Sequence, residues 1–317
     1  REAKTMFHSM QYIYEVYKER SFSKAAANLY ISQPSLSAAV KKVEEKIGAP
    51  IFDRSVSPIQ LTECGEHYIR SVEEIMEIQH RFENYLNDLN ELKTGQIAIG
   101  GSNLFASYIL PPMIARFTRK YPLVKIHLVE ADTPQLMDQL FRGSLDLVID
   151  NCQFPEAVYH PHFLAEETLL LAVPRSFSSN QKNQACQLTL EDIRQNRHLE
   201  TDFPCISLQD FAGEPFIFLR SGNDTRSRAE KICQIEGVTP NVILKLDQQV
   251  TAFNICRYGM GVTFVGDTLL KHIPDARECC FYKLDNPQTR RSIFFYYKQT
   301  RFVTRAMEEF IKNAGQI

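Results

Sequence analysis

Small polar side chains gather in the stretch "SQPSLS", residues 32–37, which we expect to begin a helix. Ser32 can cap that helix, and Pro34 suits its first turn, where a backbone N–H is not needed. A helix that enters the major groove of DNA does so with its first turn, where glutamine and serine can hydrogen-bond to base edges. The candidate base contacts are therefore Gln33, Pro34, Ser35 and Ser37, with the candidate phosphate contacts Lys41 and Lys42 one turn later.

Two further candidate DNA contacts lie outside that helix. Ser23 stands at the start of a shorter predicted helix, and Arg54 lies in a segment where two short apolar-alternating runs flank a polar turn. That segment, residues 49–62, is typical of a β-hairpin wing, and Arg54 is its strongest candidate for a phosphate contact. Residues 1–62 carry nine Lys and Arg against six Asp and Glu in a chain of net charge −2, so the basic surface is local.

Three predicted helices position these side chains. Apolar residues at helical spacing predict the first over residues 6–19, and three alanines favour a short second helix over residues 24–29 that Ser21 or Ser23 can cap. The third helix runs from its Ser32 cap to Gly48, a natural C-terminal stop. Two helices joined by a tight turn indicate a helix-turn-helix, although an ordinary helical hairpin also fits the pattern.

Residues 63–93 contain no proline and predict one long helix. Its acidic residues outnumber its basic ones, so it is unsuited to lie on DNA, and its apolar stripe must meet protein. That protein is either the rest of its own domain or the same helix of a second copy. The stripe comprises Ile69, Val72, Met76, Phe82, Leu86 and Leu89.

A second set of hydrogen-bonding side chains follows predicted strands in the rest of the chain. Strands and helices alternate as β-α-β-α-β over residues 96–150, and the same order returns over residues 215–266. In open parallel sheets, ligands bind beyond the carboxyl ends of strands, beside helix N-termini. Two such lobes would enclose a cleft suited to a small polar or carboxylate ligand, although several of these residues would serve equally as helix caps. The cleft candidates are Ser102, Asn103, Thr133, Asn151, Arg220, Thr225, Gln249, Thr251 and Gly266.

The stretch "SFSKAAANLYISQPSLSAAVKKVEEKIGAPIFDRSVSPIQLTECG", residues 21–65, resembles the DNA-binding signature of the LysR-type transcriptional regulators. The later segments "EADTPQLMDQLFRGSLDLVI" and "RRSIFFYYKQTRFVTRAMEEFIKN" are more loosely similar to the effector-binding domain of that family. Two residues depart from the family pattern, Ala38 where relatives often carry Arg and Arg20 where they usually carry Gly.

The resemblance implies a multidomain chain. Residues 1–62 would form an all-α winged helix-turn-helix domain. Residues 63–93 would form a linker helix, which pairs antiparallel with the linker helix of a second subunit. Residues 94–317 would form a two-lobed α/β effector-binding domain similar to periplasmic binding proteins. Lobe I would comprise residues 94–166 and 273–317, and lobe II residues 167–272. In relatives, the counterparts of Ser102 and Thr133 line the effector site. The implied partners are double-stranded DNA with a pseudo-palindromic operator, a small-molecule effector, and further copies in a homodimer or homotetramer.

Residues 175–215 form a connection longer than is usual in that family. We expect a loop and a short helix that either cover the cleft or decorate the edge of the second lobe; we favour decoration.

Several function classes find no support in the sequence. No apolar run is long enough to span a membrane and no signal peptide opens the chain, so we expect a cytoplasmic protein without membrane contact. We find no nucleophile elbow, P-loop or dinucleotide fingerprint, and we expect neither enzymatic activity nor a cofactor or metal. Eight scattered cysteines predict reduced thiols.

Three alternatives remain at this stage. A two-lobed chain is also the architecture of a solute-binding protein, although residues 1–62 have no place in one. Cys152 is the cysteine nearest the predicted cleft and would be the candidate for redox sensing. Cys152 with His160 and His162 is a weak match to a metal site.

Overall fold

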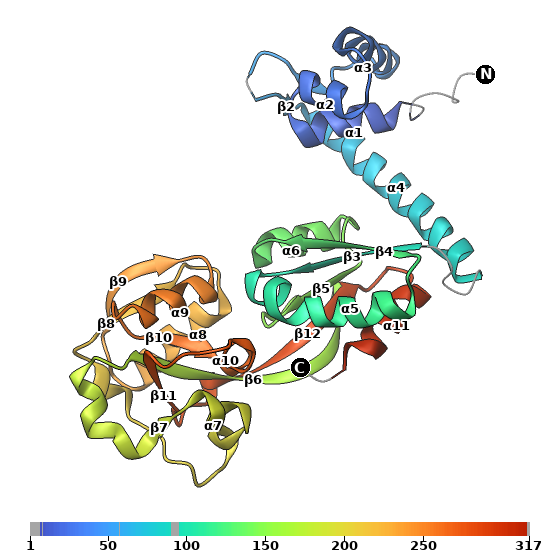
Figure 1. Ribbon diagram of the computed structural model, residues 1–317. Helices are drawn as coiled ribbons and strands as arrows, with labels where there is room; N and C mark the ends of the chain where they lie inside the picture. Colours follow the sequence, from blue (N-terminus) through green and yellow to red (C-terminus); the bar gives the residue numbers. More distant parts are fainter. Residues whose placement is uncertain (1–6, 8, 57, 90–94, 316–317) are drawn as a thin grey trace. The chain divides into compact units, whose positions relative to one another are not determined.

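The computed structural model describes residues 7, 9–56, 58–89 and 95–315. The chain forms two compact units, residues 1–83 and 84–317, which divide within one long helix. Figure 1 gives the labels of the helices and strands.

The three predicted N-terminal helices are confirmed as α1 Met10–Glu19, α2 Phe22–Asn28 and α3 Gln33–Ile47. Residues 6 and 8 of the first predicted helix lie outside the described residues. Ser21 caps α2 by accepting a hydrogen bond from the Lys24 amide, so Ser23 lies inside the helix. Ser32 caps α3, and Gly48 ends it with a φ of 79°, a conformation that favours glycine.

The wing is also confirmed. Strands β1 Phe52–Asp53 and β2 Gln60–Leu61 pair antiparallel, and Ser57 between them lies outside the described residues. Under the wing, one apolar core joins all three helices to the start of the next helix. It includes the buried residues Ile13, Val16, Ala25, Leu36, Val40, Phe52, Tyr68, Ile69 and Val72.

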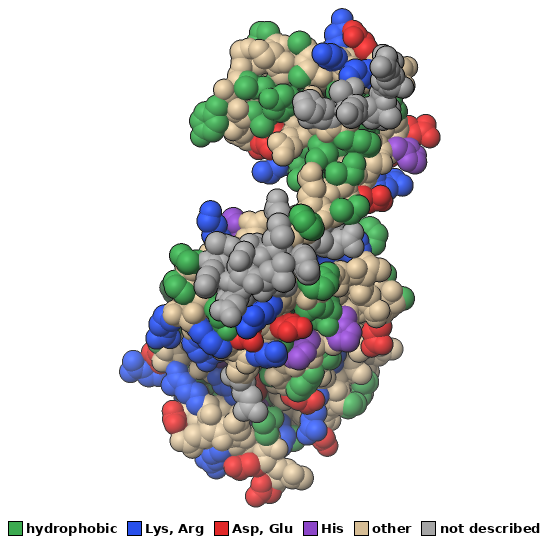
Figure 2. All heavy atoms as spheres, turned by 90° about the vertical axis from the view of Figure 1, so that its right-hand side faces the viewer, with side chains coloured by type: hydrophobic (Ala, Val, Ile, Leu, Met, Phe, Trp, Pro, Cys, Tyr) green, Lys and Arg blue, Asp and Glu red, His purple; other side chains and the backbone are tan. Residues whose placement is uncertain are grey.

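Helix α4, Glu63–Leu89, matches the predicted linker helix as far as it is described; residues 90–93 lie outside the described part. Its first turns pack on the N-terminal core through Ile69 and Val72, as expected if the apolar stripe meets the rest of its own domain. Farther along, Ile78 and Phe82 are 56% and 62% exposed. Figure 2 shows hydrophobic side chains at the surface of this part of the molecule. The start of the stripe is therefore buried in the helix's own domain, and its later residues leave apolar side chains at the surface.

Gly65 allows α4 to approach the wing. A Cβ at this position would lie 2.0 Å from the Ile51 carbonyl oxygen, which accepts a hydrogen bond from the Thr62 amide. The Thr62 hydroxyl donates to the Pro50 carbonyl and accepts from the Gly65 amide. The sequence "LTECG" thus couples the end of the wing to the start of α4.

The first lobe of the C-terminal unit is built on strands β3 Gly95–Gly101, β4 Val124–Glu130, β5 Leu147–Asp150 and β12 Arg290–Lys298. β3 runs parallel to β4 and β5, whereas β12 is antiparallel to β5. Helices α5 Leu110–Lys120 and α11 Arg305–Ala314 share a core on one face of the sheet, and α6 Thr133–Phe141 packs on the other. A π-helical turn at Phe105–Ile109 leads directly into α5.

The second lobe repeats the alternation, as predicted, with β8 Pro215–Leu219, α8 Asp224–Ile235, β9 Asn241–Leu246, α9 Gln249–Arg257 and β10 Thr263–Gly266. β8 and β9 are parallel. Helices α9 and α10 Asp267–His272 pack on one face, and α8 packs on the other.

One long strand, β6 Tyr159–Pro174, belongs to both lobes (Figure 1). Residues Tyr159–Thr168 pair with β12, and the following residues pair with β10 and with β11 Cys279–Tyr282. The crossing comes at Thr168, close to the expected residue 166. The return comes between Tyr282 and Arg290, later than the expected Ile273, because β11 adds to the sheet of the second lobe and buries Phe281 and Tyr282 in its cores.

The long connection over residues 175–215 contains the predicted short helix, α7 Leu190–Arg194, together with 3₁₀ turns and the strand β7 Gln187–Leu188. β7 extends the sheet by pairing with β11. Ile193 lies in one core of the second lobe, and Leu208 and Phe211 lie in the other. The expected surface decoration is therefore wrong, because this segment supplies core residues of its lobe.

We predict that Gly65→Ala lowers the free energy of unfolding of the N-terminal unit by about 1–3 kcal/mol, because the added methyl group overlaps the Ile51 carbonyl. Without that contact, alanine would stabilise an interior helix position. Gly213→Ala is the control, since a Cβ there meets nothing within 4 Å. Urea denaturation followed by circular dichroism measures both variants; equal stabilities would contradict the packing argument.

Candidate functional site

The exposed start of α3 carries the candidate base contacts. Gln33, Pro34 and Ser35 are exposed, and Ser37 is half-buried. The Ser23 hydroxyl donates a hydrogen bond of 3.1 Å to the Gln33 side-chain oxygen, which ties the starts of α2 and α3 together. Ser23 was predicted as a DNA contact, and this bond gives it a second role in orienting Gln33.

The basic residues of this unit differ in how they are engaged. Lys41 and Lys42 are exposed, and Lys41 forms a long 3.8 Å ion pair with Glu45. Arg54 pairs with Glu44 at 2.9 Å and lies 5.0 Å above the Phe22 ring. Because Glu44 also accepts the Ile51 amide, Arg54 ties the wing to α3, a role that its position in the sequence did not indicate.

Tyr30 is a feature of this surface that the sequence analysis passed over. It lies in the turn between α2 and α3, has a φ of 54°, and is 96% exposed. A large residue in the left-handed region is uncommon and carries a conformational cost. Its phenol therefore stands in solvent close to the start of α3.

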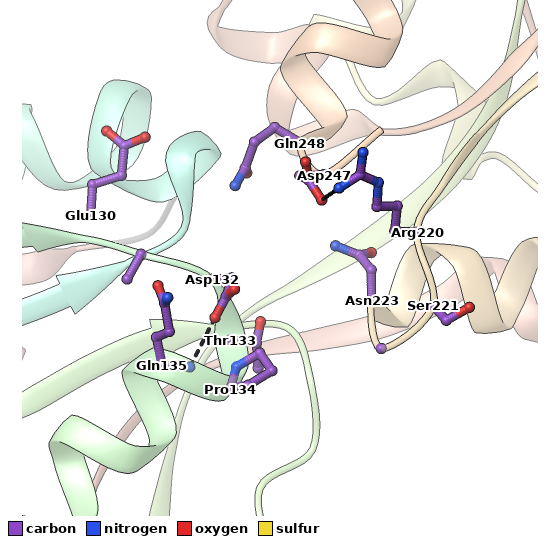
Figure 3. A pocket seen from close by; sticks show the side chains of 12 residues that line it. Glu130, Asp132, Thr133, Pro134, Gln135, Arg220, Ser221, Asn223, Asp247 and Gln248 are labelled. Carbon is purple, nitrogen blue, oxygen red and sulfur yellow. Dashed lines mark hydrogen bonds and ion pairs between the residues drawn. The ribbon is translucent and has the colours of Figure 1, made fainter. Parts of the chain in front are cut away.

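Between the two lobes of the C-terminal unit lie two adjoining cavities. The outer one, of about 300 Å³, opens between the start of α6 and the loops after β8 and β9 (Figure 3). The side chains of its two walls face each other across this space, and Arg220 pairs with Asp247 at 3.2 Å. Its lining includes Glu130, Asp132, Thr133, Gln135, Arg220, Ser221, Asn223, Asp247 and Gln248.

The inner cavity, of about 30 Å³, brings together five of the predicted cleft residues, namely Ser102, Thr133, Asn151, Thr225 and Gln249. Arg220 lines the outer cavity. The remaining three are not among the lining residues: Asn103 donates to Glu130, Thr251 is exposed on α9, and Gly266 packs on Glu167. The rule that ligands meet the carboxyl ends of strands thus found most of the polar cleft residues but, of the charged ones, Arg220 alone among the described lining.

Three helices begin at these cavities. Asp132 caps α6 just before Thr133, Asn223 caps α8 just before Asp224, and α9 starts at Gln249. The caps accept the amides of Gln135 and Thr225, and the other first-turn N–H groups, which lack intrahelical partners, are available to a polar ligand.

Arg291 of β12 is the central charged residue, and sequence reasoning missed it. Its side chain is buried, donates to Glu167 of β6 at 2.6 Å, and also donates to Asp224 and to the Thr225 hydroxyl of α8, both at 2.9 Å. Asn151 donates to the same Glu167 carboxylate at 3.1 Å. Arg291 stands among the polar residues at the start of the strand, beside the exposed Arg290, so the local sequence does not single it out as buried.

Asp150, at the end of β5, is buried beside this network. Its carboxylate accepts hydrogen bonds from the Thr133 hydroxyl and the Cys152 amide, both neutral donors. Burial raises its pKa to about 6, against the lowering effects of those bonds and of Arg291. The carboxyl group therefore titrates close to neutral pH.

The cysteines offer little support for redox sensing. Burial raises the pKa of Cys152 to about 11, which keeps it in the unreactive thiol form at neutral pH. Cys256 and Cys279 lie with their sulfur atoms 3.8 Å apart, but both are buried in the second lobe.

Among the described residues, no group of three or more His, Cys, Asp and Glu side chains could hold a metal ion, so Cys152, His160 and His162 form no such cluster. No helix in the described part of the chain is long and apolar enough to cross a membrane.

Comparison with known proteins matches both units. Residues 7–66 match the family model of the bacterial regulatory helix-turn-helix proteins of the lysR family, and residues 90–316 match the LysR substrate binding domain. YcgK of Bacillus subtilis, an uncharacterized HTH-type transcriptional regulator, is 26% identical over 96% of this chain and 92% of its own. A probable RuBisCO transcriptional regulator of Cyanidium caldarium is 28% identical over 92% of this chain and 87% of its own.

Two solved structures share the fold. A full-length OxyR from Pseudomonas aeruginosa has a TM-score of 0.72 and 21% identity, covering 99% of this chain and 95% of its own. Full-length CbnR complexed with its target DNA has a TM-score of 0.64 and 15% identity, covering 97% of this chain and 98% of its own. The helix-turn-helix unit, the two-lobed unit and both family matches lead to one conclusion: this chain belongs to the LysR family of ligand-responsive, DNA-binding transcriptional regulators.

Proposed function

We propose that this regulator reads an inverted repeat in double-stranded DNA with the start of α3, and that a small effector bound between its lobes controls that reading. The observation that carries the DNA contact is the exposed Gln33 amide, held by Ser23 at the tip of the recognition helix. Glutamine can pair bidentately with adenine in the major groove. The candidate contact surface comprises Ser23, Gln33, Pro34, Ser35, Ser37, Lys41, Lys42 and Arg54.

We further propose that the protein acts as a homodimer or homotetramer in the cytoplasm and catalyses no reaction. The exposed Ile78 and Phe82 of α4 support pairing of this helix with a second copy, because single soluble helices seldom leave two large apolar side chains in water. A two-fold pair of recognition helices requires two half-sites of fixed spacing. The CbnR complex supports DNA binding by a chain of this fold.

The cleft supports a mechanism for the response. In the described part of the C-terminal unit, β6 and the segment that leads into β12 connect the two lobes, and Glu167 and Arg291 face each other at that crossing. An effector that contacts both lobes would favour one arrangement of them over another. Such a ligand changes DNA affinity only by the difference between its affinities for the two arrangements. Candidate effector contacts are Ser102, Thr133, Asn151, Arg220, Thr225 and Gln249.

We predict that Gln33→Ala lowers discrimination between operator and unrelated DNA by about 1–3 kcal/mol, because a bidentate base contact is lost. Gln11→Ala, the same substitution at an exposed position of α1, serves as the control. Fluorescence anisotropy with a promoter duplex and a scrambled duplex measures the ratio of affinities. If both variants keep the wild-type ratio, base reading lies elsewhere.

We predict a different result for Lys42→Ala. A lysine that contacts a phosphate carries no sequence information, so operator and scrambled DNA should both bind more weakly and by similar factors. The slope of the logarithm of affinity against the logarithm of salt concentration should fall by about 1. An unchanged slope would remove Lys42 from the phosphate contacts.

A further inference from the structure

The interlobe cleft contains more carboxyl than guanidinium groups. In the outer cavity, Arg220 stands against Glu130, Asp132 and Asp247. In the inner cavity, Arg291 stands against Asp150 and Asp224. The described lining thus has five carboxyl groups against two guanidinium groups, a surface that repels an effector whose polar groups are all carboxylates.

Neither arginine brings unmatched positive charge. Arg220 pairs with Asp247. Arg291 is bonded to Glu167 and Asp224 through Nε and Nη1, and only its Nη2 atom is buried without a partner. Arg291 therefore offers a ligand one donor atom, Nη2, but not the bidentate, charge-neutralising pairing that a free guanidinium gives to a carboxylate.

The inner cavity also holds acceptor oxygens that could receive a donor from a ligand. The Gln249 side chain is 8% exposed, and its carbonyl oxygen has no partner. The Asp150 carboxylate, also buried, is bonded to neutral donors. A cavity of about 30 Å³ has room for a group the size of a water molecule or an ammonium ion.

On the basis of the proposed effector cleft, we propose that the effector carries a protonated amino group. The amino group occupies the inner cavity between Asp150 and the Gln249 carbonyl, and the rest of the effector extends into the outer cavity. A hydroxyl or carboxylate oxygen beside the amine would accept the unpartnered Arg291 N–H. This narrows the expected "small polar or carboxylate" ligand to amines and amino acids and excludes plain carboxylic acids.

Three probes with the same four-carbon chain test this proposal on the full-length protein, namely 1,4-diaminobutane, 4-aminobutyrate and succinate. At millimolar concentration, at least one amine-bearing probe should raise Tm by about 5 °C, as expected for a ligand well above its Kd. Succinate should leave Tm unchanged. Stabilisation by succinate alone, or by none of the probes, overturns the proposal.

Asp150→Asn identifies the group that receives the amine. It replaces a charge at constant shape and should weaken binding of the stabilising amine by about 10- to 100-fold, the effect of losing a charge-assisted hydrogen bond. Asp210→Asn, at an exposed position outside both cavities, should bind the amine like the wild type. Equal binding by Asp150→Asn and the wild type also overturns the proposal.

The pH dependence of binding gives a second readout. Besides the neutral Thr133 of α6, the groups around Asp150 are Arg291 and Tyr296 of β12, Cys152 of the following turn, and Asp224 across the cavity. The pKa of Tyr296, about 12, and that of Cys152, about 11, keep both neutral, and Arg291 stays charged. Amine affinity should therefore fall about tenfold from pH 7 to pH 5 as Asp150 takes up a proton, and Asp150→Asn should abolish this change.

The pH dependence of Tm without ligand tests whether Asp150 has a raised pKa. A carboxyl group whose pKa is raised from 3.8 to about 6 in the folded protein contributes stability below pH 4 that is lost as pH rises through 6. The Tm of Asp150→Asn should exceed that of the wild type at pH 7 and converge with it near pH 4. A lower Tm for the variant at pH 7 would count against the buried acid.

Failure of this proposal is distinct from failure of the proposed function. Operator binding by anisotropy is measured on the same samples without probe. Loss of operator binding by the wild type would overturn the regulator mechanism, whereas intact operator binding with succinate-selective stabilisation would overturn only the amine proposal.

Discussion

The buried ion network around Arg291 joins the parts of the C-terminal unit that must act together. Its guanidinium bonds to Glu167 on β6, the strand shared by both lobes, and to Asp224 at the start of α8 in the second lobe. Asn151 bonds to the same Glu167 carboxylate from the first lobe. Removal of one member of such a network leaves a buried charge uncompensated, at a cost of about 3–5 kcal/mol. The lobes are therefore linked by charge as well as by two strands.

Because of this linkage, the charged groups that line the cleft also connect the two lobes. The inner cavity lies beside the network, and its lining includes groups that belong to both lobes and to their connection. Gly266 shows how closely the parts fit, since a Cβ there would lie 2.1 Å from the Glu167 carboxylate. Arg291 and Glu167 lie on the crossing strands themselves, so the charges of this network belong to the connection between the lobes.

In the N-terminal unit, too, a few polar contacts hold several elements together. Glu44 on α3 holds the wing through Arg54 and through the Ile51 amide. Gly65 lets α4 approach the carbonyl of the same Ile51. Helix α3, the wing and the first turns of α4 thereby share one core.

The sequence by itself determined the elements and their order. Caps at Ser32 and Gly48, the apolar periods and the repeated β-α-β-α-β pattern are local signals, so α3, the wing and both lobes could be predicted from them, as could Ser102, Thr133, Thr225 and Gln249 at strand ends. Only the tertiary structure decided which distant charges meet. Arg291, Glu167 and Asp224 are far apart in the chain, and the pairing of β6 with β12 brings them together. The late return to the first lobe and the core role of residues 175–215 likewise depend on the pairing of β11 and β7, which local sequence periodicity does not encode.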